Sequence, residues 1–398
     1  MTPGPGMHRT PLPLGFLAAG VNSGVRRYRP DLGIIFTESD SVVAGVFTVN
    51  EAKAAPVRYC QEILPGQKIR AIVTNSGQAN AATGPEGVLN NVRMAQSAAR
   101  ALGVKPAQVL TASTGVIGQR LEIEKIEGAM TELIARSSNV AEHFALAILT
   151  TDLVPKTVTT VITLSTGSVR ITGIAKGSGM IHPNMATMLG YLLTDAELSP
   201  ELAQALLKST VDDSFNMISV DGDSSTNDGT FLMASGASGV CLVSAQDQTE
   251  FQQGLLRISQ FLAQAIAADG EGATKLIEVE LKGAPELDMA RRAARSLTLS
   301  SLIKTAIHGE DPNWGRILAR LGAEQVPVAL LDKMILKLQG HVIFAGGMPV
   351  DFDRVEVKAS MRDPKVHISI DFRSGVEQAL AWGCDLSKRY VDINTEYS

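Results

Sequence analysis

Apolar and polar positions recur with two different spacings along this chain, and these spacings predict helices and strands. In residues 86–102, 123–135 and 249–267, apolar side chains recur every three or four positions, as on a helix with one buried face. Residues 158–164 and 169–175 are β-type runs on either side of a short polar turn, so we expect a hairpin there. Strands and helices follow one another through the chain, which predicts an α/β fold.

The two ends of the chain carry less regular patterns. Residues 33–37 and 42–49 are β-rich runs separated by a polar turn, which predicts an opening hairpin. The last third is β-rich and finishes with residues 374–382, whose spacing predicts a helix. Four short strands are expected before that helix, at residues 334–338, 341–345, 354–359 and 367–372. We therefore expect a smaller β-rich part at the C-terminal end.

Composition and charge restrict the class of protein. The chain has 398 residues, of which 45% are hydrophobic and 19% charged, so it can bury a large core as two domains or as one large α/β unit. Its formal net charge of -5 provides no basic excess for phosphate groups, and we expect neither nucleic acid nor anionic membranes as partners. The sequence also lacks an uncharged apolar run of about 18 residues, so we expect no membrane span.

The three cysteines, Cys60, Cys241 and Cys384, are widely separated. Their odd number and their spacing predict neither a disulfide framework nor a metal site. A reducing cytosol is the simpler environment for such a chain, so we expect a cytoplasmic protein.

A glycine-rich segment, residues 176–190, lies near the middle of the chain. A β-type run ends at Ala175, and two glycines and a proline then prevent regular structure. The small pair Ala186-Thr187 stands where an apolar segment resumes. Composition alone favours a tight loop before a buried element, because such loops are common.

Two further polar loops follow predicted strands. In residues 113–118, hydroxylated residues and glycine, including Thr114 and Gly115, can expose backbone amides to a ligand. Residues 221–229 are rich in Asp, Ser and Asn, but Thr226 replaces the glycine that an EF-hand requires. This second loop either turns the chain into a strand at residues 230–234 or also lines a polar substrate pocket.

Taken as a whole, residues 176–190 resemble the self-cleavage segment of the ornithine acetyltransferase (glutamate N-acetyltransferase) family. The resemblance extends over nearly the whole chain, from Gly15 to Asn394. The other matching blocks are Ala44-Gly45-Val46-Phe47-Thr48, Asn75-Ser76-Gly77, Ser113-Thr114-Gly115-Val116-Ile117-Gly118, Thr150-Thr151-Asp152, Asp221-Gly222-Asp223, Glu271-Gly272-Ala273-Thr274-Lys275, Gly309-Glu310-Asp311 and Asn313-Trp314-Gly315-Arg316. The order of these blocks makes chance similarity a poor explanation.

The resemblance implies a fold and a set of site residues. The fold is a layered α-β-β-α sandwich like that of N-terminal-nucleophile aminopeptidases, with no clean linker between structural domains. Cleavage between Ala186 and Thr187 would give an alpha chain, residues 1–186, and a beta chain, residues 187–398. Thr187 would be the nucleophile, and Thr114 with Gly115 would form the oxyanion hole. The implied substrate contacts are Thr150, Lys176, Thr187, Glu271, Asn394 and a C-terminal hydroxyl, assigned here to Ser398, four residues after Asn394 where the family usually has five.

Elementary chemistry agrees with these implied roles. A threonine hydroxyl is a weak nucleophile, but a free α-amine with a pKa of about 7.7–8.0 can act as its base near neutral pH. The Thr114 hydroxyl and the Gly115 N–H are suitable donors to an oxyanion. Lys176 and Glu271 carry the charges that would pair with the carboxylate and the ammonium of an amino acid, although composition alone would make them surface ions.

The function implied by the resemblance is acetyl transfer from N-acetylornithine to glutamate through an acetyl-Thr187 intermediate with ping-pong kinetics, in arginine biosynthesis. Acetyl-CoA is expected as a second donor, no cofactor or metal is needed, and the family assembly is a heterotetramer of two alpha and two beta chains. One alternative is an N-terminal-nucleophile amidase or aminopeptidase, which uses the same threonine but lets water resolve the acyl-enzyme. Another is an uncleaved metabolite-binding protein that keeps the fold without the chemistry.

Overall fold

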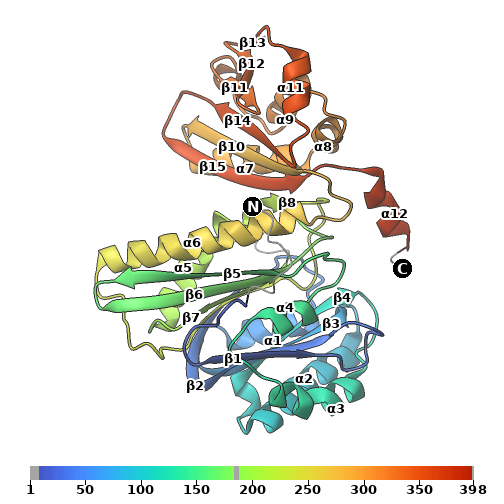
Figure 1. Ribbon diagram of the computed structural model, residues 1–398, viewed down its shortest axis with the longest axis vertical. Helices are drawn as coiled ribbons and strands as arrows, with labels where there is room; N and C mark the ends of the chain where they lie inside the picture. The colour runs from blue at the N-terminus through green and yellow to red at the C-terminus, as the bar shows by residue number, and fades with distance from the viewer. Residues whose placement is uncertain (1–8, 183–187, 397–398) are drawn as a thin grey trace. The chain divides into compact units, whose positions relative to one another are not determined.

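The computed structural model describes residues 9–182 and 188–396, which form two compact units. The larger unit consists of residues 9–177, 188–211 and 224–262, and the smaller of residues 178–182, 212–223 and 263–396. Both units mix strands and helices (Figure 1). Within the described ranges, none of the helices combines the length and apolar content that a membrane span requires.

The larger unit is built on one eight-stranded sheet in the order β4-β3-β2-β9-β7-β6-β5, with β1 paired to β2. Its strands are β1 (Phe16–Val21), β2 (Leu32–Phe47), β3 (Gly66–Gln78), β4 (Val109–Val116), β5 (Lys156–Leu164), β6 (Gly167–Lys176), β7 (Leu189–Thr194) and β9 (Gly229–Ala234). Its helices are α1 (Ala55–Ile63), α2 (Gly84–Leu102), α3 (Ile123–Ala135), α4 (Glu142–Ala147), α5 (Pro200–Asp212) and most of α6 (Ala245–Ala268), with a short 3-10 turn η1 (Pro106–Gln108).

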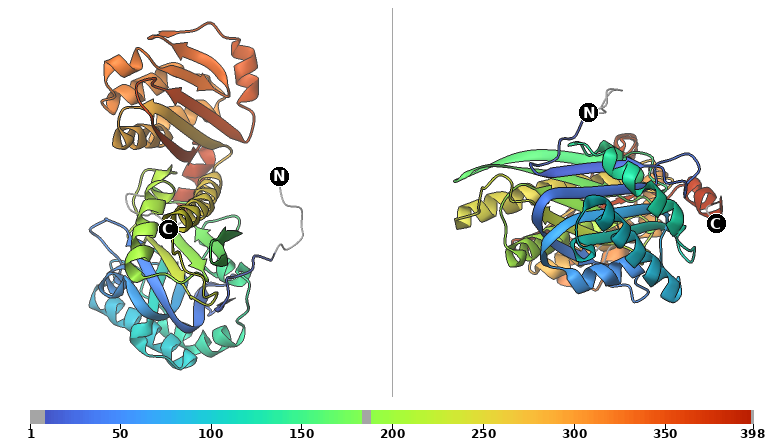
Figure 2. Two further views of the ribbon diagram at one scale, coloured as in Figure 1. Left: turned by 90° about the vertical axis from the view of Figure 1, so that its left-hand side faces the viewer. Right: turned by 90° about the horizontal axis from the view of Figure 1, so that it is seen from below.

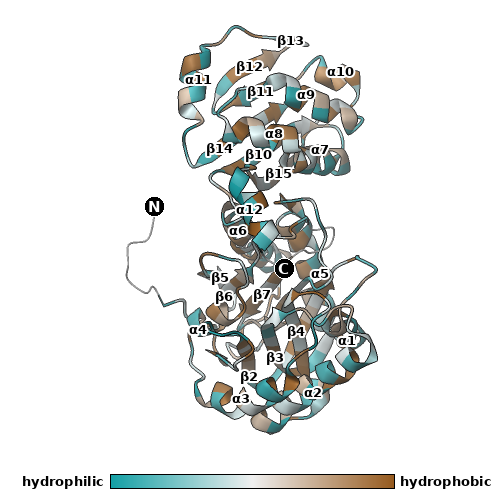
Figure 3. Cartoon of the chain, turned by 90° about the vertical axis from the view of Figure 1, so that its right-hand side faces the viewer, coloured by the Kyte–Doolittle hydropathy of each residue, from teal (hydrophilic) through white to brown (hydrophobic). Residues whose placement is uncertain are grey.

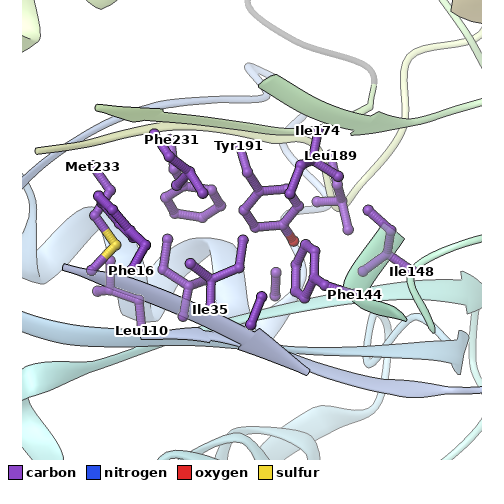
Figure 4. Packing of buried hydrophobic residues seen from close by; sticks show 14 of the residues in the cluster. Phe16, Ile35, Leu110, Phe144, Ile148, Ile174, Leu189, Tyr191, Phe231 and Met233 are labelled. Atoms are coloured by element: carbon purple, nitrogen blue, oxygen red, sulfur yellow. The ribbon is translucent and has the colours of Figure 1, made fainter. Parts of the chain in front are cut away.

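This sheet folds back on itself into two layers, because β1 pairs only with the first part of β2, up to Thr37, whereas β9 pairs only with its second part, from Val42 to Phe47. Apolar side chains of both layers meet between them (Figure 4). Phe16 and Ile35 come from one layer, and Tyr191, Phe231 and Met233 from the other. Their burial holds the layers together, at about 1.5–3 kcal/mol for each large apolar side chain removed from water.

Helices cover the outer faces of both layers. On one side, Met94 of α2 and Ile126 of α3 pack against strands β1, β2 and β3, and the right view of Figure 2 looks onto these helices. On the other side, Gly173 of β6 lies so close to α6 that an added Cβ would come within 2.6 Å of Ile258. The order helix, sheet, sheet, helix confirms the predicted α-β-β-α sandwich.

The smaller unit has a seven-stranded sheet in the order β13-β12-β11-β14-β10-β15-β8. Its strands are β8 (Ile218–Ser219), β10 (Leu276–Ala284), β11 (Ile335–Leu338), β12 (His341–Ala345), β13 (Met348–Pro349), β14 (Lys365–Asp371) and β15 (Glu377–Cys384). Its helices are α7 (Leu287–Leu299), α8 (Ser301–His308), α9 (Trp314–Ala323), α10 (Val328–Leu331), α11 (Arg354–Ser360) and α12 (Lys388–Glu396), with a 3-10 turn η2 (Phe215–Met217). Helix α7 packs on β10 and β15. The predicted β-rich C-terminal part is confirmed.

The predicted opening hairpin is wrong, because residues 33–49 lie mostly in the single strand β2. Residues 38–40 are exposed and polar, but the pairing of β2 with β3 only shifts register between Phe36 and Ser41. An irregularity of this kind bends a strand without reversing it. Two short elements on either side of β2 were not predicted: strand β1 before it and helix α1 after it.

Two predictions near the C-terminus are also wrong. Residues 354–359 form helix α11 instead of a strand, because the Asp353 side chain accepts hydrogen bonds from the N–H groups of Val355 and Glu356 at 2.8 and 3.1 Å. The predicted helix at residues 374–382 is largely strand β15. It pairs with β10 on one side and β8 on the other, and this pairing outweighs the helix propensity of its alanines and leucine.

Candidate functional site

The predicted oxyanion-hole residues lie at the end of β4, where β4 runs parallel to β3. Gly115 has a φ of 135°, and a Cβ placed on it would lie 2.2 Å from the carbonyl carbon of Gly77. Only glycine fits so close to the neighbouring backbone. The Thr114 side chain is buried beside it. The fold thus presents a hydroxyl and the amide of a glycine next to each other at one strand end.

Lys176, the last residue of β6, contacts this strand end directly. Its Nζ donates a hydrogen bond to Thr114 Oγ1 at 3.1 Å, and the lysine is buried. Because the Thr114 oxygen accepts from an ammonium group, its own O–H is directed elsewhere and can serve as a donor. The structure therefore brings together three predicted site residues: Thr114, Gly115 and Lys176.

A buried carboxylate, Asp152, organises the residues around Lys176. It accepts from the Lys156 Nζ at 2.8 Å, from the Gly177 N–H at 2.7 Å and from the Thr150 N–H at 3.1 Å. Burial by itself would raise the pKa of Asp152, but the charges of Lys176 and Lys156 hold it well below its ordinary value. The predicted contact Thr150 is thereby tied to the strand end that carries Lys176.

A second carboxyl group, Asp228, was not predicted as a site residue. It stands directly before β9, and the next residue, Gly229, donates its N–H to the Met188 carbonyl at 3.1 Å. Asp228 is only 4% exposed, and its Oδ2 has no hydrogen-bond partner among the described residues. Burial raises the pKa of Asp228 well above its ordinary value, although the Lys176 charge and hydrogen bonds from Ser225 oppose this. The polar loop at residues 221–229 was the only signal in the sequence for this group.

Glu271 and Asn394 form a group of their own within the smaller unit. The Asn394 Nδ2, on α12, donates to Glu271 Oε2 at 2.9 Å, and the Glu271 N–H donates to the Ser178 carbonyl at 3.1 Å. A Cβ added to Gly179 would lie 2.3 Å from Glu271 Oε1, so the carboxylate rests against bare backbone. Two predicted substrate contacts are therefore neighbours, one nearly buried and one on a helix that is mostly hydrophilic (Figure 3).

Three predicted residues, Ala186, Thr187 and Ser398, lie outside the described residues. The assignments of Thr187 as nucleophile, of the bond between Ala186 and Thr187 as the cleavage site, and of Ser398 as a substrate contact remain predictions.

Full-length relatives of this chain carry a common name. It is 46% identical over 395 residues to the arginine biosynthesis bifunctional protein ArgJ of Thermotoga neapolitana, covering 97% of this chain and 99% of that protein. It is 42% identical over 400 residues to the protein of the same name from Synechocystis, covering 97% of each. A crystal structure of ArgJ from Bacillus halodurans matches with a TM-score of 0.50 and 37% identity, over 53% of this chain and 100% of that one. A model of the ArgJ family matches residues 17–398, and with these relatives it shows that the chain belongs to the ArgJ family.

Proposed function

We propose that this protein is an acetyltransferase of arginine biosynthesis that moves an acetyl group from N-acetylornithine to glutamate. The observation that carries the proposal is the contact between Lys176 and Thr114 beside Gly115, within a chain of the ArgJ family. Two adjacent donors at a strand end are what an acyl-transfer site needs for the negative charge that forms on a carbonyl oxygen.

In the first half-reaction, Thr187 Oγ attacks the acetyl carbonyl and its proton passes to the free α-amine of the same residue. The carbonyl oxygen becomes an oxyanion, which the Thr114 hydroxyl and the Gly115 N–H stabilise. The C–N bond then breaks, and the ornithine nitrogen takes the proton from the α-ammonium group. Ornithine leaves, and the acetyl group stays on Thr187 as an ester.

In the second half-reaction, the amine of glutamate attacks the ester, and the same groups act in reverse. N-acetylornithine carries a side-chain ammonium, which suits Glu271 with Asn394, and both substrates carry a carboxylate, which suits the Lys176 ammonium. Acetyl-CoA is proposed as a second donor for the same acetyl-threonine, because the relatives from Thermotoga neapolitana and Synechocystis are named as bifunctional proteins.

The mechanism requires a free α-amine on Thr187, so we propose that the precursor cleaves itself into residues 1–186 and 187–398. The two chains would remain associated, because both contribute strands to the sheet of the larger unit. We further propose a heterotetramer of two alpha and two beta chains as the assembly.

Initial rates with varied N-acetylornithine and glutamate test the proposal. Parallel double-reciprocal lines and an acetylated beta chain in the intact mass spectrum are expected, since one product leaves before the second substrate reacts. Intersecting lines without acetyl-enzyme would overturn the covalent route. Release of acetate without glutamate would instead identify an amidase, and a single uncleaved chain without turnover would identify a binding protein.

A further inference from the structure

The backbone directly before the Thr114–Gly115 donor pair is held by one buried side chain, that of Asn227. Its Nδ2 donates to the Ser113 carbonyl at 2.9 Å and also to the Ala79 carbonyl. Ser113 precedes Thr114 on β4, and Ala79 follows the end of β3. Asn227 is only 7% exposed, so these two hydrogen bonds are shielded from water.

The orientation of the Asn227 carboxamide is determined by its neighbours. Its Oδ1 accepts from Thr226 Oγ1 at 2.6 Å, while its nitrogen faces the two carbonyl oxygens. A flipped amide would place its own oxygen against both carbonyls and lose both bonds. Only one orientation of the carboxamide therefore satisfies all three of these hydrogen bonds.

The turn that carries Asn227 is itself fixed at several points. Thr48 donates to it twice, from its hydroxyl to the Ser225 carbonyl at 2.9 Å and from its N–H to the Asp228 carbonyl at 3.1 Å. The Ala54 N–H donates to the Thr226 carbonyl at 2.9 Å. The carboxamide thus projects from a rigid base and is able to hold β4 in place.

We propose that Asn227 is a positioning residue for the Thr114–Gly115 oxyanion hole, an inference that rests on the proposed function. Holding the Ser113 carbonyl fixes the peptide plane between residues 113 and 114. This plane precedes the Cα of Thr114 and helps to fix its position, and both the hydroxyl and the following Gly115 N–H are oriented from that Cα. Lys176 orients the hydroxyl hydrogen, and Asn227 orients the backbone that carries both donors.

Such support matters because oxyanion donors act only where they are already in place when charge develops. A displacement of about 1 Å at a reacting centre can cost on the order of 10²-fold in rate. We therefore expect Asn227→Ala to lower kcat by about 10- to 100-fold, with the KM for N-acetylornithine changing by less than about 3-fold. Asn227→Asp keeps the volume and the acceptor for Thr226 but loses both hydrogen bonds to the carbonyl groups. It replaces the alanine variant if that variant does not fold, and the same decrease in kcat is expected.

The decisive measurement is a double-mutant cycle with Thr114→Ala, with kcat expressed per mature chain as determined by intact mass. If Asn227 acts through the hole, its substitution should cost at least about 3-fold less in the Thr114→Ala background than in wild type, because only the Gly115 N–H is then left to be misplaced. Gln204→Ala is the matched control. This carboxamide also forms two hydrogen bonds with backbone of the larger unit, but with the N–H and carbonyl of Gly45 on β2 and not with β4. The control should keep kcat within about 2-fold.

Two results would overturn the inference. One is a wild-type kcat in a folded Asn227 variant, and the other is a loss that multiplies fully with that of Thr114→Ala, as for an independent structural residue. Failure of the proposed function is distinguishable, because then wild-type protein transfers no acetyl group, or Thr114→Ala by itself has no effect.

Discussion

The two groups of candidate site residues, one in each unit, are held by different physical means. In the larger unit, Thr114, Lys176 and Asp152 are buried at the ends of three chain segments and joined by charge and hydrogen bonds. In the smaller unit, Glu271 lies against backbone and meets an exposed asparagine on α12, a helix without buried residues. The first arrangement is suited to preorganised chemistry and the second to recognition that can adjust to its ligand.

The comparison predicts that losses in the larger unit appear in kcat and losses in the smaller unit in KM. Thr114→Ala should have the largest effect, a decrease in kcat of roughly 10²-fold or more with little change in KM, because in the proposed mechanism the hydroxyl stabilises charge that exists only in the transition state. Steady-state kinetics on fully cleaved protein checks this. Thr111→Val, an isosteric change in the same strand, is the control and should retain turnover. Wild-type turnover in mature Thr114→Ala would falsify the oxyanion-hole assignment.

Glu271→Gln should mainly raise KM. The change keeps the shape and the acceptor for Asn394 but removes the charge that would face a substrate ammonium group. Hydrogen bonds to charged groups contribute about 1.5–3 kcal/mol, which corresponds to a rise of about 10- to 100-fold in KM for N-acetylornithine. Glu280→Gln, on β10 of the same unit, should leave KM unchanged. If Glu271→Gln lowered only kcat, the assignment of KM effects to the smaller unit would be wrong.

Asn394→Ala should have a smaller effect on the same constant. It removes one hydrogen bond to Glu271 from an exposed position, which is worth about 0.5–1.5 kcal/mol, or roughly a 2- to 10-fold rise in KM. Thr395→Ala on the same helix is the control, because its hydroxyl binds only the Asp392 carbonyl among the described residues. A fall in kcat larger than the rise in KM would show that α12 contributes to the chemistry.

Asp228→Asn tests, through the pH dependence of stability, whether Asp228 of the larger unit is buried. Since burial raises the pKa of Asp228, the folded protein keeps a proton that the unfolded chain releases above pH about 4, and wild-type stability falls as pH rises from there. Asparagine does not titrate, so the stability of the variant relative to wild type should increase from about pH 4.5 to about pH 7.5. Thermal melts of both proteins at these two pH values check this. A constant difference across this range would contradict the raised pKa.

Asp247→Asn provides the opposite sign as a control. Hydrogen bonds from the Ser165 N–H and hydroxyl lower the pKa of Asp247 to about 2. The stability that this carboxylate contributes is present above about pH 4 and is lost as pH falls toward 2. The variant should therefore be less stable than wild type near neutral pH and approach it in acid.

Local patterns predicted most elements of the larger unit. The helix at residues 123–135 has the predicted bounds, and the hairpin of β5 and β6 delivers the chain to Lys176 as expected. These elements are determined by spacing and turn residues within one stretch of chain, so they can be read without the rest of the fold. The family and its fold were predicted from motifs that are likewise contiguous in sequence.

Elements that depend on distant partners were missed or assigned wrongly. Strand β15 has a helical composition, but its neighbours β10 and β8 decide its conformation. The support of the candidate site is of the same kind: Asn227 binds carbonyls that lie 148 and 114 residues away in sequence. The charges of Lys176 and Lys156 lower the pKa of Asp152, and burial raises the pKa of Asp228, so both shifts exist only in the folded chain. Motifs that resemble those of a family predicted which residues carry the chemistry, whereas only the tertiary structure decided their burial, electrostatic environment and orientation, because these depend on neighbours that sequence order does not specify.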